Sequence, residues 1–154
     1  MLIKQVSEIL KNRSFVSVAT CDLSGNPNAA PKFFLKIHEH YLYLIDYTFG
    51  RTWENLKINP KASLSFVDTE TLISYQVNGK VETIDTGKEF GEILKEMVAK
   101  EVSLSTKRII EGVTTGKKHL SFEIGIREKF FILKLKIEEI VEIGSNGEIK
   151  REKI

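Results

Sequence analysis

The sequence predicts a mainly β protein, an antiparallel β-barrel with peripheral helices, and a single domain over residues 1–154. Three observations support this fold class. Much of the chain consists of β-branched and aromatic runs separated by turn residues. The runs follow one another without the regular strand–helix alternation of a parallel sheet. The chain of 154 residues is 42% hydrophobic and 29% charged, which is typical of a globular protein.

A change of period separates the first helix from the strands that follow it. Apolar residues at helical spacing indicate a short amphipathic helix over residues 2–12. From Ser14 onward, runs rich in β-branched and aromatic residues end at clusters of Gly, Pro, Asn and Asp. Asn78-Gly79 interrupts the fifth of these runs, and its glycine indicates a bulge or a corner. The strands expected here are residues 15–20, 28–37, 41–46, 62–67 and 72–84.

Two further helices are expected between the strands. Thr52 stands where an N-cap is expected, and Asn59-Pro60 ends the short helix that follows it. Thr86 is expected to cap a helix that continues through Val98. Residues 103–118 are ambiguous, with a helix around 107–111 followed by a glycine-rich loop. The chain then closes with strands over residues 119–124 and 129–143 and a turn at residues 144–147.

Charge and cysteine content argue against several classes of function. The net charge is only +2, and basic residues are interleaved with acidic ones, so nucleic-acid binding is not expected. The single cysteine, Cys21, cannot form an internal disulfide and suits a reducing compartment. No apolar run reaches the roughly 18 residues of a membrane span, and no signal-peptide core is visible near the N-terminus. We therefore expect a cytoplasmic protein that does not bind membranes.

The most informative segment is Asp46–Leu56. Here an expected strand leads into a loop with Gly50, and Arg51 and Thr52 follow at the start of a helix. The N–H groups and the macrodipole of a helix start favour an anion. Arg51 adds a planar group that can bind phosphate in a bidentate way, and Thr52 adds a hydroxyl donor. By itself, the pattern fits an anion site and a simply capped helix with a surface arginine equally well.

The second predicted strand holds another candidate surface. Strand alternation is expected to put Lys32, Phe34 and Lys36 on one face and Phe33 and Leu35 on the other. Two lysines on one face of a core-forming strand are unusual unless that face meets solvent or an anionic ligand. When the strand is considered alone, an edge or a solvent face is the favoured interpretation.

The order and spacing of these segments resemble the FMN-binding split barrel of the pyridoxamine 5'-phosphate oxidase superfamily. The resemblance extends over Phe15–Val67, and within it Arg51–Asn55 is similar to the Lys-Thr-x-x-Asn segment of small bacterial FMN-binding proteins. Gln76–Glu82 resembles the strand-Gly-strand that follows in the family, and the helix after Thr86 comes in the corresponding place.

The resemblance implies an FMN cofactor and a homodimer with flavins between its subunits. The implied cofactor contacts are Lys32, Phe33, Phe34, Lys36, Tyr47, Thr48, Arg51 and Thr52. On the second strand, backbone groups would hydrogen-bond the isoalloxazine edge, and the Lys36 side chain would approach the ring or the phosphate. Tyr47 and Thr48 would lie beside the flavin. Arg51 and Thr52 would bind its phosphate. No catalytic residue is assigned, and the substrate and electron donor are not named.

The chain departs from the oxidases in three places. Thr52 stands at the third basic position of a shortened phosphate loop, and Ser74 at the position nearest to a flavin-binding glutamine. Ile137–Val141 lacks the Arg-x-His substrate element. We therefore expect an FMN-dependent oxidoreductase that is not a true pyridoxamine phosphate oxidase. The open alternatives are a noncatalytic flavin or electron carrier, a barrel that binds heme or the deazaflavin F420, and a cofactor-free interaction module.

Other motifs give weaker indications. His38-x-His40 lies at a turn without a third ligand nearby, so no metal site is expected. Gly112–Lys118 resembles a phosphate loop but is one residue short between its glycines, and it is interpreted as a plain loop. Cys21 is expected to be a small residue at a strand end, and Trp53 is expected to pack in the core.

Overall fold

The computed structural model describes residues 1–115 and 129–154. Contacts divide the chain into one unit of residues 1–84 and 130–154 and another of residues 85–129. The prediction of a single domain is not tested by this division and stays a prediction. The elements are α1 (Leu2–Lys11), β1 (Phe15–Cys21), β2 (Pro27–His38), β3 (Tyr41–Asp46), α2 (Arg51–Ile58), β4 (Lys61–Asp68), β5 (Ile73–Ile84), α3 (Lys88–Thr115), β6 (Phe131–Ile143) and β7 (Ile149–Lys153).

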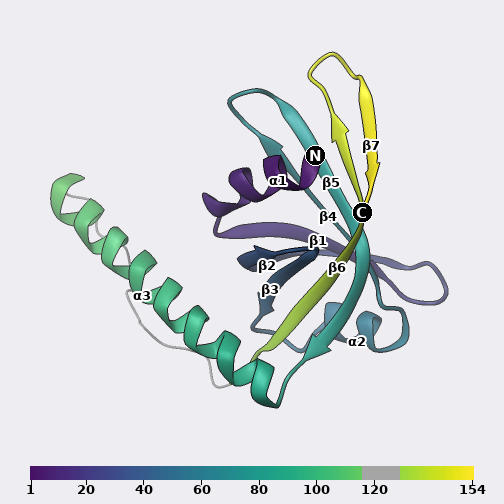
Figure 1. The fold of residues 1–154 in the computed structure, drawn as a ribbon. Coiled ribbons are helices and arrows are strands. Elements are labelled where there is room, and N and C mark those ends of the chain that lie inside the picture. The colour runs from purple at the N-terminus through teal and green to yellow at the C-terminus, as the bar shows by residue number, and fades with distance from the viewer. Residues whose placement is uncertain (116–128) are drawn as a thin grey trace. The chain divides into compact units, whose positions relative to one another are not determined.

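Six strands of the first unit form a closed antiparallel barrel (Figure 1). Hydrogen-bonded neighbours follow the order β3-β2-β1-β4-β5-β6, and β3 also pairs with β6, which closes the barrel. Strand β7 forms a hairpin with the second half of β6, Glu139–Ile143, on the edge opposite β5. The predicted fold class, a mainly β antiparallel barrel with peripheral helices, is confirmed.

The interior of the barrel is apolar. Alternate residues of β1 and β4, such as Val18 and Leu64, are buried, while the residues between them are exposed or partly exposed. Helix α1 buries Ile3, Val6 and Leu10 in the same core, as its helical spacing predicts. Each fully buried side chain of this size stabilises the fold by about 1.5–3 kcal/mol relative to an exposed one.

Strand β2 contains a bulge that changes which face its side chains occupy. Phe34 lies opposite Leu44, but the next pair is Lys36 with Tyr43, so Leu35 is the extra residue. An extra residue reverses the inside–outside alternation from that point on. Phe34 and Leu44 therefore belong to the barrel core, whereas Lys36 shares the face of Tyr43, with its ammonium 5.0 Å from that ring. The prediction that Lys36 shares a face with Phe34 is wrong.

In its described residues, the second unit contains one long helix. Helix α3 spans 28 residues, so it continues beyond Val98 and includes the helix predicted around residues 107–111. Residues 99–111 contain no proline or glycine, and many of them are good helix formers. Gly87, with φ of +97°, directly precedes the helix, rather than Thr86. The predicted strand over residues 119–124 lies outside the described residues, as does the end of the Gly112–Lys118 motif. None of the described helices is both long and apolar enough to cross a bilayer.

Candidate functional site

A buried carboxylate anchors the loop between β3 and α2. Asp46 is the last residue of β3, is 3% exposed, and pairs across the ladder with the core residue Phe131. Its Oδ1 accepts hydrogen bonds from the backbone N–H and the hydroxyl of Thr48, both at 2.8 Å. Its Oδ2 lies 2.7 Å from Nζ of Lys32, which is 5% exposed. A buried ion pair thus links β2 to the loop before α2.

Helix α2 begins without a capping side chain. Its first residue is Arg51 and its N-cap is Gly50, so the prediction that Thr52 is the N-cap is wrong. By helix geometry, the first N–H groups of α2 lack acceptors within the helix. Thr52 is buried, and its Oγ1 accepts a hydrogen bond from the Asn28 side-chain amide at 3.3 Å. Because the amide is the donor, the hydroxyl proton of Thr52 is not used in this bond.

The Arg51 guanidinium is on the surface beside this helix start. Its Nη1 lies 3.1 Å from the Glu54 carboxylate, and both side chains are more than half exposed. Asp22, in the turn after β1, also interacts with its charge. Hydrogen bonds from the side chain and backbone of Asn26 are the main reason that the pKa of Asp22 is lowered, and Arg51 contributes least. An exposed pair such as Arg51–Glu54 contributes little free energy, so the guanidinium can turn toward a stronger anion.

Three aromatic rings pack between the loop and the barrel core. Trp53 has its ring centroid 4.9 Å from that of Phe49 and 4.7 Å from that of Phe131. Trp53 is partly buried against the core, which confirms its predicted packing role. Phe49 is 43% exposed, so it offers an apolar edge next to the start of α2.

The eight predicted cofactor residues lie in different surroundings. Lys32 and Phe34 are inside the barrel, and the ammonium of Lys32 is held by Asp46. Phe33 packs edge-on against Phe15 at 5.7 Å, and Lys36 lies on the outer face. In the loop before α2, Tyr47 is half-buried and Thr48 is exposed. In the first turn of α2, Arg51 is exposed and Thr52 is buried. Their contacts with a flavin stay predictions.

Sequence reasoning missed the polar residues that fix α2 and its loop. Asp46 was read only as the end of a strand. Asn55 donates a hydrogen bond to the buried Thr20 at 3.1 Å, and Asn59 donates to the carbonyl of Cys21 at 3.2 Å. An acid directly after an apolar strand and a lysine in a core-forming strand were the available signals for the ion pair. Cys21 is the last residue of β1, as predicted.

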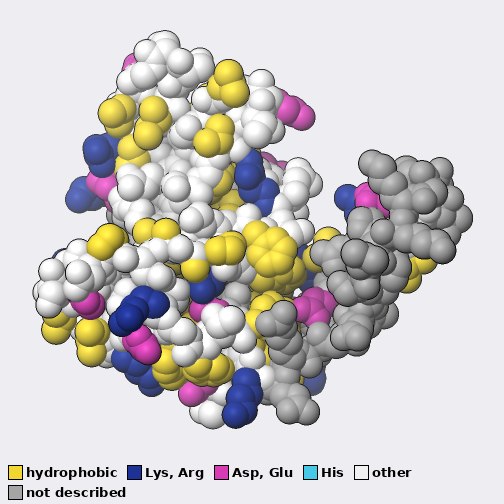
Figure 2. Space-filling view, turned by 180° about the vertical axis from the view of Figure 1, so that it is seen from behind, with side chains coloured by type: hydrophobic (Ala, Val, Ile, Leu, Met, Phe, Trp, Pro, Cys, Tyr) yellow, Lys and Arg dark blue, Asp and Glu magenta, His cyan; other side chains and the backbone are white. Residues whose placement is uncertain are grey.

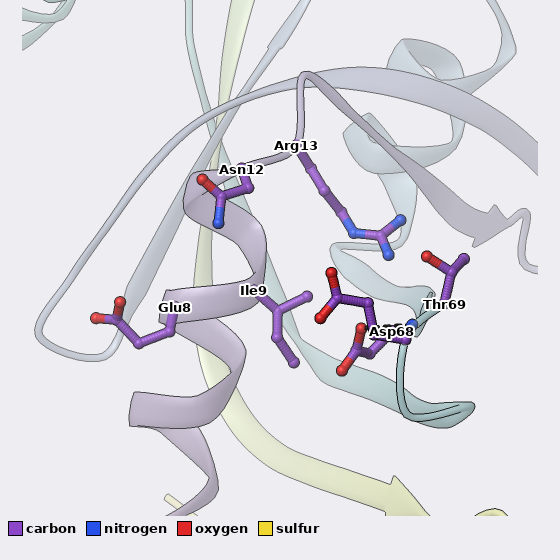
Figure 3. A pocket seen from close by; sticks show the side chains of 7 residues that line it. Glu8, Ile9, Asn12, Arg13, Asp68 and Thr69 are labelled. Carbon is purple, nitrogen blue, oxygen red and sulfur yellow. Dashed lines mark hydrogen bonds between the residues drawn. The ribbon is translucent and has the colours of Figure 1, made fainter.

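A cavity of about 560 Å³ lies elsewhere, between the end of α1 and the turn from β4 to β5 (Figure 3). The Arg13 guanidinium there donates to the carbonyl of Val67. The Asp68 carboxylate accepts hydrogen bonds from Thr71 and from the N–H of Glu70, which lower its pKa, the Thr71 bond most. These groups therefore already have partners. Within the described residues, no group of three or more His, Cys, Asp or Glu side chains is arranged to hold a metal ion.

The model of a family described as pyridoxamine 5'-phosphate oxidase matches residues 2–142. The chain belongs to this family. The match includes α1, α2 and the six barrel strands, and it ends at Glu142 in β6. The predicted relationship to the pyridoxamine 5'-phosphate oxidases is confirmed.

Proteins similar to this chain are named after different cofactors, namely heme, FMN and F420. Heme oxygenase HutZ of Vibrio cholerae serotype O1 is 24% identical over 131 residues, which are 83% of this chain and 74% of HutZ. A pyridoxamine 5'-phosphate oxidase-related, FMN-binding protein of Nostoc punctiforme has a TM-score of 0.62 at 16% identity, over 98% of this chain and 95% of its own. An F420 reductase has a TM-score of 0.56 at 15% identity, over 87% and 94%. These structural similarities show the shared fold, and the family does not by itself specify the cofactor.

Proposed function

We propose that this chain binds FMN and is a flavin-dependent oxidoreductase of its family, other than a true pyridoxamine phosphate oxidase. The observation that carries the proposal is the start of α2, where no side chain caps the helix and the Arg51 guanidinium is exposed beside it. Orphan N–H groups, the positive end of the macrodipole and a planar cation together suit a phosphate monoester. The Thr52 hydroxyl retains a proton to donate to the same anion.

When bound, the flavin ring supplies the redox chemistry, and the protein supplies binding and orientation. Arg51 exchanges its weak pair with Glu54 for the phosphate. Phe49 offers an exposed apolar edge next to this corner, and Lys36 places a positive charge on the outer face of β2. Positive charge near the ring favours the anionic reduced flavin.

Heme is the second candidate because HutZ is a heme oxygenase. A heme iron is held in most proteins by His, Cys, Met or Tyr. In the described part of the chain, the histidines are His38 and His40, both exposed in the turn between β2 and β3. They lie at the opposite end of β3 from the loop that leads to α2, whereas His119 is outside the described residues. These positions argue against a heme held by His38 or His40 at the α2 corner.

The cofactor is tested by the absorption spectrum of the purified protein and by mass analysis of what denaturation releases. Cofactor-free protein is then titrated with FMN, riboflavin, F420 and hemin. We expect FMN to bind much more tightly than riboflavin, since only FMN carries the phosphate. An Arg51→Ala variant is expected to weaken FMN binding by about 10- to 100-fold and to leave riboflavin binding unchanged.

Lys57→Ala is the matched control, because Lys57 is an exposed cation on the same helix whose ammonium lies 4.1 Å from the Trp53 ring. It is expected to leave the preference for FMN intact. Equal affinity for FMN and riboflavin in the parent protein would refute the phosphate site. Reduction of the bound flavin by NAD(P)H, followed by reoxidation in air, would distinguish an enzyme from a flavin carrier.

We also propose a homodimer, because the family places its flavins between two subunits. Exposed apolar side chains on the outer faces of β1 and β4, such as Phe15 (54% exposed) and Val67 (41%), are available for such contact. On the face drawn in Figure 2, apolar side chains are spread among polar ones, and basic and acidic side chains are interspersed. Sedimentation equilibrium is expected to give twice the mass of one chain.

A further inference from the structure

The pair of Lys32 and Asp46 is an unusual feature of the barrel interior. Both side chains are at least nine-tenths buried, and their neighbours on the inner face, Val16 and Phe131, are apolar. Taking two charges out of water is costly, and apolar residues of similar volume often stabilise such a site better. The stability of the barrel therefore does not by itself account for the pair.

The second oxygen of Asp46 shows what the pair holds in place. Oδ2 faces Lys32, while Oδ1 accepts both the N–H and the hydroxyl of Thr48. The hydroxyl oxygen of Thr48 in turn lies 4.0 Å from the position that a Cβ on Gly50 would occupy. Thr48 precedes the N-cap residue Gly50 by two positions, so one carboxylate connects a buried ammonium to the loop that leads into the helix.

We propose that Asp46 is a positioning residue for the phosphate corner and that Lys32 is its fixed counter-charge rather than a ligand of the flavin. The pair holds residues 47–50 in the conformation that presents the first N–H groups of α2 and the Arg51 guanidinium to one anion. This inference rests on the proposed FMN site for the identity of the anion.

The test separates the charges of Lys32 and Asp46 from the role of Asp46 as the hydrogen-bond acceptor for Thr48. Lys32→Met with Asp46→Leu replaces both charges by apolar groups, so no lone charge is left buried, but Thr48 loses its acceptor. Lys32→Met with Asp46→Asn also removes both charges but keeps a side-chain oxygen for Thr48. Tyr75→Phe is a control that removes a buried hydrogen bond to Glu142, far along the sequence from this loop.

We expect Lys32→Met/Asp46→Leu to remain folded by circular dichroism and to bind FMN about tenfold more weakly, with riboflavin affinity unchanged. General damage to the fold would weaken both ligands. The Asn-containing double variant is expected to retain FMN affinity within about threefold. Tyr75→Phe is expected to change neither affinity. If the Leu-containing variant is folded and binds FMN as tightly as the parent, the proposal is overturned.

Hydrogen exchange of the cofactor-free protein distinguishes this inference from the proposed function. The amides of residues 47–52 are expected to exchange at least about tenfold faster in the Leu-containing variant than in the Asn-containing one, while those of β1 and β4 are unchanged. If the parent binds no FMN but this difference is present, the positioning role stands and only the flavin assignment fails. Equal exchange in the two variants overturns the positioning role.

Discussion

Tyr75 and Glu142 are two buried polar residues that pair across β5 and β6. Tyr75 is 4% exposed and donates its hydroxyl to Oε2 of Glu142 at 3.3 Å, and Phe66 stacks on its ring. The other Glu142 oxygen lies 3.3 Å from Nζ of Lys150. Burial is the main cause that raises the pKa of the Tyr75 phenol, and the Glu142 carboxylate raises it further.

The raised pKa of Tyr75 predicts a specific loss of stability at alkaline pH. The folded protein holds the phenol proton more tightly than the unfolded chain does, so the stabilisation is complete below the unfolded pKa of about 10. It is lost as the pH rises toward the higher pKa of the folded state. Tyr75→Phe is expected to cost about 1 kcal/mol at pH 7 and to flatten the decline above pH 10, measured by urea unfolding. Parallel curves for the parent and the variant would contradict the prediction.

At this scale, the sequence predicted the start of a helix near Arg51 better than it predicted the ion pair beside that helix. Arg51 at a helix start is a local pattern, and a local pattern can be read directly from neighbouring residues. The contact of Lys32 with Asp46 depends on how β2 is paired with β3, and no short-range pattern specifies that pairing. The interpretation of Lys32 as a surface cation is therefore wrong.

Among the elements, helix α1 depends on the hairpin at the other end of the chain. Its N-cap, Met1, has no capping side chain, and the N–H of Leu2 donates instead to Oε2 of Glu152 in β7 at 2.9 Å. A carboxylate at a helix N-terminus also interacts favourably with the macrodipole. Glu152→Ala is expected to lower the free energy of unfolding by about 1 kcal/mol, whereas Glu148→Ala, at an exposed turn residue, is expected to have little effect. Urea unfolding measures both, and equal losses would exclude the capping role.

The bulge in β5 makes glycine necessary at one position. The register shifts between Asn78 and Gly79, as predicted, and a Cβ on Gly79 would overlap the carbonyl oxygen of Lys136 on β6. Gly79→Ala is therefore expected to cost at least about 2 kcal/mol in thermal or urea unfolding. Gly91→Ala is the control, since it has open space in α3 and should stabilise that helix by up to about 1 kcal/mol. A neutral Gly79→Ala variant would show that the two strands can move apart.

Elements whose apolar residues recur at a regular spacing were predicted closely. Elements in which that spacing is interrupted were not. Strand β3 has the predicted limits, because Tyr41–Asp46 is bounded by a turn and a loop. In β2, the extra residue at Leu35 left no signal in a run of consecutive apolar residues. Residues 103–118 were ambiguous in the sequence, and those up to Thr115 belong to helix α3.

For the whole molecule, β6 is the strand that closes the barrel. It pairs with β3 on one side and β5 on the other, and Leu133 lies opposite both Leu44 and Thr83. Leu133 is fully buried, so Leu133→Ala is expected to lower the free energy of unfolding by about 2–5 kcal/mol. Because a closed barrel is expected to open cooperatively, hydrogen exchange should accelerate in all six strands together. Ser65→Ala on the outer face of β4 is the control, and acceleration confined to β6 would contradict cooperative closure.

The bulge at Leu35 has a consequence for how substitutions are tolerated along β2. Before Leu35, even-numbered residues such as Phe34 face the interior. After it, odd-numbered residues such as Ile37 do. In a saturation scan of this strand, positions that tolerate polar residues should therefore alternate with positions that do not, and the alternation should shift by one residue at Leu35. Deleting Leu35 would restore a regular ladder in which Phe34 still faces the interior and Lys36 still faces outward, so the strand should accept the loss of one residue at this point better than elsewhere.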